Sequence, residues 1–230
     1  MPVITFANSK GGSGKTTSAL LLACELATER PVTIIDADPR RPITKWATLP
    51  GKPERLTVIS NESEKTILEE IEEASAVSTF VIVDLEGTAS RLMSYAISQS
   101  DLVIVPMKEQ TQDATAAVDV VREIHRDMKA ARRKIPYSIL FTQSKVVAKS
   151  RTARFVASQF RENPDFHVFQ TEIFDRDAFS ALFSVGGTVR TLSKDTVRTT
   201  EEAVKNVQSY THEVVKRLKD AMGIKNADAA

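Results

Sequence analysis

The 230-residue sequence has little cysteine, no long apolar run and no internal repeat. Its one cysteine, Cys24, excludes a disulfide or a cysteine metal cluster within one chain, and two such chains cannot supply four cluster thiolates. No 18-residue apolar run occurs and the first 17 residues do not resemble a signal peptide, so we expect a cytoplasmic protein. Without a low-complexity linker, the chain is predicted to form one domain over 1–225 and a frayed tail over 226–230.

The net charge of +1 conceals two halves of opposite sign. Residues 1–120 carry 11 Lys/Arg against 17 Asp/Glu, and residues 121–230 carry 20 against 13, which gives −6 and +7. A basic half of this kind indicates a surface for an anionic partner.

The glycine-rich residues 8–17 follow the apolar run 3–7 and precede a helical pattern over 18–29. A strand, a glycine turn and a helix start together make a phosphate-binding loop, because glycines let backbone N–H groups converge on one anion. Lys15 then reaches the phosphates and Thr16 offers a hydroxyl to Mg²⁺. The alternative is a Gly/Ser turn with solvated lysines. The residues assigned to the nucleotide are Lys10, Gly11, Gly12, Ser13, Gly14, Lys15, Thr16 and Thr17.

Two apolar runs end in carboxylates. Residues 31–35 lead to Asp36 and Asp38, and residues 80–83 lead to Asp84. The carboxyl ends of parallel strands gather at one edge of a sheet, so these carboxylates are expected near the glycine loop. Asp84 is a candidate magnesium-shell carboxylate, although apolar strands also end in aspartate simply to form a turn.

Strand-like runs alternate with helical patterns along the chain. This alternation predicts an α/β fold with a doubly wound, mainly parallel sheet and helices on both faces. The last parallel strand is expected over 168–173, and a long C-terminal helix over 195–222.

Residues 10–17 resemble the deviant Walker A loop of the ParA/MinD family of P-loop ATPases, in which the extra lysine, here Lys10, is the signature residue. Residues 34–39 are similar to the second motif of that family, and residues 81–84 to its Walker B strand. Residues 85–88 differ from the proline-containing switch that many partition ATPases have at this place. Residues 36–46 are also similar to the T-DNA border-binding ATPases of virulence regions.

The resemblance implies an ATP- and Mg²⁺-dependent sandwich homodimer in which Lys10 reaches the partner's nucleotide. Lys15 would hold the phosphates and Asp38 would orient the attacking water. Asp36 and Asp84 would order the outer shell of the metal. The implied catalytic residues are therefore Lys10, Lys15 and Asp38, and the implied metal residues are Thr16, Asp36 and Asp84.

The function expected first is DNA partition by a slow ATPase. In this hypothesis the ATP-bound dimer binds DNA without sequence preference at the nucleoid, and a ParB-like centromere-binding protein stimulates hydrolysis. Backbone binding needs several Lys and Arg side chains, which the C-terminal half supplies. The candidate DNA-contact residues are Lys149, Arg151, Arg154, Arg176, Arg190, Lys194 and Arg198.

Two other functions remain open at this stage. One is an accessory ATPase for DNA transfer that recruits a relaxase complex. The other is a MinD-like membrane-cycling regulator, which would need an amphipathic membrane helix near the C-terminus. Residues 213–224 have an apolar stripe but no aromatic anchor, so that stripe is expected to pack on the sheet, and a membrane partner is not expected.

Overall fold

A computed structural model describes the chain except residues 62, 88–89, 194–196, 198–199 and 224–230. Seven strands form a sheet in the order β3-β2-β4-β1-β5-β6-β7, and every strand pair is parallel. The expected doubly wound sheet is thereby confirmed. The strands are β1 (Val3–Phe6), β2 (Val32–Ala37), β3 (Leu56–Ser60), β4 (Phe80–Leu85), β5 (Leu102–Met107), β6 (Tyr137–Ser144) and β7 (Ile173–Phe174).

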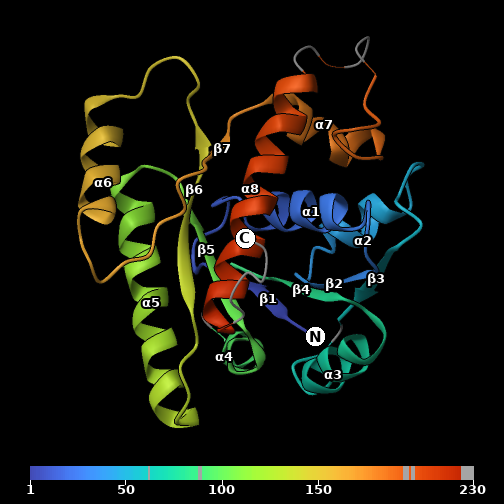
Figure 1. The fold of residues 1–230 in the computed structure, drawn as a ribbon, viewed down its shortest axis with the longest axis horizontal. Coiled ribbons are helices and arrows are strands. Elements are labelled where there is room, and N and C mark those ends of the chain that lie inside the picture. The colour runs from blue at the N-terminus through green and yellow to red at the C-terminus, as the bar shows by residue number, and fades with distance from the viewer. Residues whose placement is uncertain (62, 88–89, 194–196, 198–199, 224–230) are drawn as a thin grey trace, which may run out of the picture.

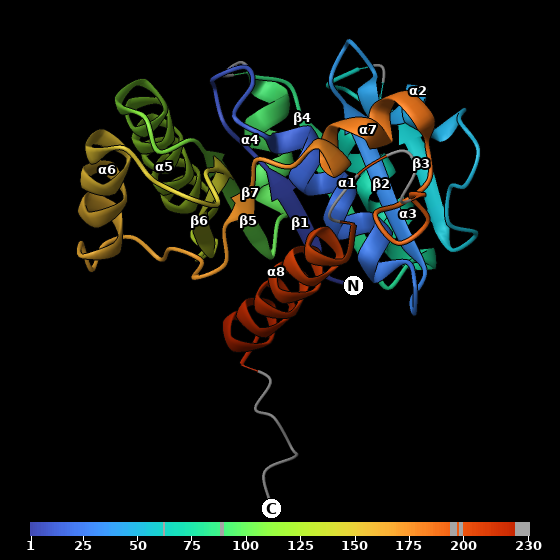
Figure 2. The same ribbon diagram turned by 90° about the horizontal axis from the view of Figure 1, so that it is seen from above.

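Helices cover both faces of the sheet (Figure 1). One apolar core joins the sheet to α1, α2, α7 and α8, and a second joins it to α3, α4, α5 and α6. Figure 2 shows the same layers from above. The helices are α1 (Lys15–Leu26), α2 (Pro42–Ala47), α3 (Ile67–Val77), α4 (Arg91–Gln99), α5 (Thr111–Ala131), α6 (Arg151–Arg161), α7 (Asp177–Val185) and α8 (Thr200–Ala221).

The central strands are buried on both sides, which explains their continuous apolar sequences. In β5, Leu102 and Ile104 pack toward α1 and α8, whereas Val103 and Val105 pack toward α4 and α5. All four side chains are fully buried. An alternation of polar and apolar residues would have placed polar side chains against the helices on one face of this strand.

The carboxyl ends of three central strands meet at one place. Phe6 at the end of β1 lies in register with Asp84 of β4 on one side and with Ile104 of β5 on the other. Asp84 is in turn in register with Asp36 of β2. The connection from β1 to α1 therefore begins beside Asp84, with Asp36 one strand further, at the edge where ligands bind in such sheets.

The last strand differs from the sequence expectation. We expected it over 168–173, but β7 is only Ile173–Phe174, and Val168 makes an isolated bridge to Ile139. Between them, the N–H groups of Gln170 and Thr171 donate to the Glu213 carboxylate, at 2.6 and 2.8 Å. Side chains of α8 thus take hydrogen bonds that a longer strand would have given to β6.

The C-terminal helix α8 is Thr200–Ala221, shorter than the expected 195–222, because Val197 and Met222 are described and are not helical. Of the predicted stripe over 213–224, Val214 and Leu218 are buried against the sheet core, whereas Met222 is 49% exposed and residue 224 lies outside the described residues. The stripe therefore packs inward in its first part only. No helix among the described residues is long and apolar enough to cross a membrane. The predicted tail 226–230 lies outside the described residues.

Candidate active site

The loop between β1 and α1 needs glycine at defined places. Gly12 and Gly14 have φ of 74° and 90°, the left-handed region that L side chains rarely adopt. A Cβ on Gly14 would also lie 3.0 Å from the Cβ and Oγ1 of Thr142. Helix α1 starts directly after Gly14, whose carbonyl accepts from the N–H of Ser18 at 2.9 Å. The glycines thereby place the loop at a helix N-terminus, which favours an anion.

Residues of β6 and of the β4–α4 connection hold this loop in place. The Thr142 hydroxyl donates to the Ser13 carbonyl at 2.7 Å, and the Gln143 amide donates to the Gly12 carbonyl at 3.2 Å. On the other side, a Cβ on Gly87 would lie 3.1 Å from the Gly11 nitrogen. Thr142 was not expected at the site, because it belongs to no phosphate-binding motif, whereas Gly87 lies in the loop 85–88 that stands at the place of the switch in partition ATPases.

Lys15 directs its ammonium toward this loop. Its side chain is buried, and its Nζ donates to the Lys10 carbonyl at 3.3 Å. Burial lowers the pKa of Lys15, while the nearby carboxylates of Asp84, Asp38 and Glu86 oppose that shift. A bound phosphate would stabilise the charged form of this lysine.

Asp84 is the most unusual group in the site. It is fully buried, and neither carboxylate oxygen makes a well-formed hydrogen bond to any described residue. Burial raises its pKa to about 8; the Thr16 hydroxyl partly offsets the shift, and Asp36 adds to it. A dry carboxylate facing a threonine hydroxyl has the chemistry of a Mg²⁺ site, since Mg²⁺ prefers oxygen ligands. These residues therefore fit the implied metal.

Asp36 is buried beside Asp84 but is differently placed. One oxygen, Oδ2, accepts from the Thr44 N–H at 2.7 Å and from the Thr44 hydroxyl at 2.9 Å, whereas Oδ1 has no partner among the described residues. Burial raises the pKa of Asp36, and the bonds from Thr44 lower it in part. Asp36 thus ties α2 to the site and keeps one oxygen for a further contact.

Asp38 lines the same hollow as the phosphate loop. This hollow has a volume of about 560 Å³, and its walls also include Lys15, Thr16 and Gly87. Asp38 accepts from the N–H of Arg40 at 2.8 Å, which orients its carboxylate at the start of the turn after β2. The structure therefore brings Asp38 together with Lys15 and Thr16.

A smaller hollow of about 190 Å³ adjoins the loop at Gly14 and Thr17. Phe174 and Phe179 supply aromatic walls, and Gln143 lies between this hollow and the larger one. A hollow with two aromatic side chains and several polar ones, among them the Gln143 amide, can hold a flat heterocycle that carries hydrogen-bonding groups.

Lys10 lies apart from the lining of the phosphate hollow. Its Nζ forms an ion pair with Asp113 in the first turn of α5. Its backbone N–H donates to Asn8 Oδ1 at 2.8 Å, and the Asn8 amide donates to the Pro106 carbonyl at 2.7 Å. The signature lysine is thus tied to the β5–α5 connection of its own chain.

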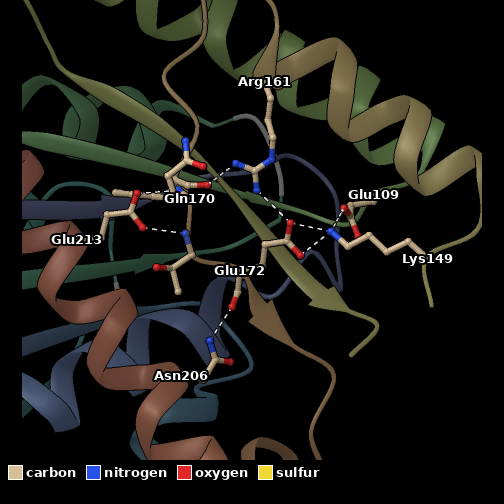
Figure 3. Close-up of polar contacts among 9 residues, drawn as sticks. Glu109, Lys149, Arg161, Gln170, Glu172, Asn206 and Glu213 are labelled. Atoms are coloured by element: carbon tan, nitrogen blue, oxygen red, sulfur yellow. Dashed lines mark hydrogen bonds and ion pairs between the residues drawn. The ribbon is translucent and has the colours of Figure 1, made fainter. Parts of the chain in front are cut away.

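Two of the DNA-contact candidates form ion pairs inside the chain. Lys149 lies between Glu109 and Glu172, with its Nζ 2.6 Å from each carboxylate (Figure 3). Arg190 binds both oxygens of Glu25, at 2.9 and 2.6 Å. These carboxylates neutralise the charges that DNA phosphates would otherwise meet.

The other candidates are less constrained. Arg151 and Arg154 are exposed on α6 and form no ion pair within the described chain, and Arg176 lies 5.6 Å from the centre of the Phe174 ring. Arg176 also lines an open groove of about 720 Å³ together with Lys149 and an unpredicted lysine, Lys205. Lys194 and Arg198 lie outside the described residues.

Comparison with known proteins agrees with this geometry. A family model described as VirC1 protein matches residues 1–222. Protein ParA of Rhizobium radiobacter is 36% identical over 223 residues, covering 96% of this chain and all of the relative. Protein virC1 of Rhizobium rhizogenes is 28% identical over 188 residues, covering 79% and 80% of the two chains.

Solved structures share the fold. A variant of McdA from Cyanothece, in complex with ATP, has a TM-score of 0.71 at 15% identity and covers 100% of this chain and 99% of its own. A plasmid partition protein from Borrelia burgdorferi bound to AMPPNP has a TM-score of 0.65 at 19% identity and covers 91% and 99%. The resemblance noted at residues 10–17 is confirmed: the chain belongs to the VirC1 protein family, among P-loop ATPases of the ParA type.

Proposed function

We propose that this protein is a Mg²⁺-ATP-dependent DNA partition ATPase. The observation that carries the proposal is the dry Asp84 carboxylate, which faces Thr16 at the first turn of α1 beside Lys15. Hydrogen-bond donors for phosphates next to oxygen ligands for a metal ion together make a nucleoside triphosphate site. A Gly/Ser turn with solvated lysines would need neither set of groups. The 36% identity to a protein named ParA supports the partition role.

In the proposed reaction the protein mainly positions groups and neutralises charge. Backbone N–H groups of residues 11–16 and the Lys15 ammonium bind the phosphates. Thr16 and Asp84, with Asp36 beside them, would hold Mg²⁺, which supplies positive charge next to the phosphates. Asp38 orients the attacking water from the wall of the hollow. The adenine base would occupy the smaller hollow, between Phe174 and Phe179 near Gln143.

Dimer formation and DNA binding are further parts of the proposal. The ATP-bound protein would form a sandwich dimer in which Lys10 contacts the partner's nucleotide. The dimer would bind DNA through its phosphates, with Arg151, Arg154 and Arg176 as the least neutralised of the predicted contacts that the structure describes. A ParB-like centromere-binding protein would then stimulate hydrolysis and release the DNA.

The test combines nucleotide hydrolysis with DNA binding. Purified protein should hydrolyse ATP slowly with Mg²⁺, and with ATP it should retard duplex DNA of unrelated sequences at low salt. Lys15→Ala should abolish both activities. Lys129→Ala, which removes an exposed lysine of α5 far along the chain from the loop, serves as the matched control. Failure of the ATP-loaded wild type to retard DNA at low salt would contradict the partition proposal.

A second function is supported by the family match. The VirC1 model covers residues 1–222, and two curated virC1 proteins are each 28% identical over 188 residues. These matches favour an accessory ATPase of DNA transfer that recruits a relaxase complex, with the same nucleotide chemistry. Pull-down of the ATP-bound protein from its own cells decides between them: a relaxase in the eluate supports transfer, and a centromere-binding protein supports partition.

A membrane-cycling role has less support. Of the residues that would form the membrane-facing stripe, Val214 and Leu218 are buried in the core between α8 and the sheet, whereas Met222 is exposed. Co-sedimentation with anionic vesicles in the presence of ATP would reveal such a role.

A further inference from the structure

The ion pair between Lys10 and Asp113 joins two segments that are 103 residues apart. Asp113 belongs to the first turn of α5 and is fully buried, whereas about a third of the Lys10 side chain is exposed. The pair therefore connects the long, partly exposed side chain of Lys10 with the carboxylate of Asp113, which has no access to water.

The Asp113 carboxylate has little polar contact besides Lys10. Its Oδ1 lies 3.4 Å from the N–H of Lys108, which is a long hydrogen bond, and its Oδ2 contacts Lys10. If Lys10 moves away, a buried carboxylate loses its cation, and unpaired buried charge is strongly unfavourable. The start of α5 compensates only in part, through its N-terminal partial charge.

Hydrogen bonds that do not involve Asp113 hold the backbone of Lys10. Asn8 connects the Lys10 N–H to the carbonyl of Pro106 at the end of β5. Lys15 donates to the Lys10 carbonyl from inside the loop. Release of Lys10 from Asp113 therefore requires only rotation of the side chain and leaves the phosphate loop in place.

We propose that Asp113 is a positioning residue that holds Lys10 within its own subunit until the ATP dimer forms. This inference rests on the proposed function, in which Lys10 acts on the partner's nucleotide. In this proposal the buried Asp113 carboxylate and the nucleotide across the interface compete for the single ammonium group of Lys10. Asp113 then raises the protein concentration needed for ATP-dependent dimerisation and suppresses hydrolysis by protein that has not paired.

The first experiment compares Asp113→Asn with the wild type by sedimentation velocity in ATP and Mg²⁺. Asparagine keeps the size of the side chain but removes the charge that holds Lys10. We expect half-dimerisation at about tenfold lower protein concentration, a factor typical of coupled sites. The matched control is Asp119→Asn, which breaks an exposed pair with Arg122 on the same helix and should leave the threshold unchanged.

The outcomes separate the two proposals. A wild type that stays monomeric in ATP contradicts the proposed dimer itself. A wild type that dimerises, with Asp113→Asn dimerising at the same or a higher concentration, overturns the role of Asp113 alone. In a Lys10→Ala background the substitution at Asp113 should no longer lower the threshold, because there is no lysine left to release.

A measurement on the unmodified protein does not depend on the folding of any variant. Acetylation of each lysine by an amine-reactive reagent is followed by mass spectrometry in the absence of nucleotide. Lys10 should react several-fold more slowly than the exposed Lys129, because Asp113 engages its ammonium. Equal reactivity of the two lysines without nucleotide would overturn the proposal.

Discussion

Asp36 and Asp84 lie in register on the neighbouring strands β2 and β4, and both are fully buried. Their proximity contributes to the raised pKa of Asp84, after the larger effect of burial. Two adjacent buried carboxylates destabilise the empty site when both are ionised. The fold thus maintains an arrangement that a bound cation would relieve, which is why the pair points to a ligand and not to a stabilising core contact.

The first prediction concerns the pH dependence of stability. The pKa of Asp84 is about 8 in the folded chain against an ordinary value of 3.8, so the folded state binds its proton more tightly than the unfolded state. This aspartate therefore lowers the free energy of unfolding as pH rises from about 4 to 8, by at most about 1.4 kcal/mol per pH unit. Asp84→Asn should remove that slope.

Urea unfolding of the nucleotide-free protein at several pH values measures this effect. The stability advantage of Asp84→Asn over the wild type should grow between pH 5 and 8. Asp101→Asn is a suitable control. Asp101 accepts from the Val3 N–H far from the site, is less buried than Asp84, and is not next to Asp36. Parallel pH profiles for the wild type and Asp84→Asn would contradict the assignment.

The second prediction concerns Lys15. Replacing it with alanine removes the ammonium that the loop directs at the phosphates. We expect ATP affinity to fall about a hundredfold, the factor that corresponds to roughly 3 kcal/mol of charged hydrogen bonding. Isothermal titration calorimetry with ATP and Mg²⁺ measures the change, and an affinity within twofold of the wild type would exclude Lys15 from phosphate binding.

The third prediction separates binding from hydrolysis at Asp38. Asp38 lines the hollow from the turn after β2 and is not part of the glycine loop, so Asp38→Ala should leave ATP affinity nearly unchanged. Hydrolysis should fall by a factor of about 100 or more, as expected for loss of a residue that positions the nucleophile. Size-exclusion chromatography with ATP should then show a persistent dimer. Normal stimulated turnover in this variant would remove Asp38 from the catalytic role.

The fourth prediction tests the close approach at Gly14. Alanine there would need φ near 90° and would press its Cβ against Thr142, so we expect a loss of about 1–3 kcal/mol in stability and loss of ATP binding. Gly223→Ala is the matched control, since Gly223 also has positive φ but no atom within 4 Å of an added Cβ. Equal losses of stability from the two substitutions in thermal unfolding would show that the loss comes from backbone strain at positive φ and not from the contact with Thr142.

The local parts of the site could be predicted from the sequence, whereas its long-range supports could not. Residues 10–17 form a contiguous motif, and Asp84 ends a recognisable buried strand. Thr142 and Asp113 reach the loop from 129 and 103 residues away, and only the order of strands in the sheet brings them there. Similarly, the sequence predicted a longer last strand because it cannot reveal that Glu213 of α8 takes the hydrogen bonds of residues 170 and 171.

The same distinction applies to the predicted DNA contacts. Lys149 and Arg190 were chosen for their charge, but each binds carboxylates that are distant in the sequence. Arg151 and Arg154 are on one turn of α6 and form no ion pair within the described residues. A free cation gains more from a DNA phosphate than a paired one, because the paired cation must first leave its carboxylate.

The fifth prediction follows from that difference. Arg151→Ala with Arg154→Ala should weaken binding of ATP-loaded protein to duplexes of any sequence, and should reduce the slope of log affinity against log salt by about 2. Arg190→Ala should change the slope by less than 1, because its guanidinium already binds Glu25. Fluorescence anisotropy over a range of salt concentrations gives both slopes. A larger effect from Arg190 than from the α6 pair would place the DNA surface near α1 and α7, on the opposite face of the sheet from α6.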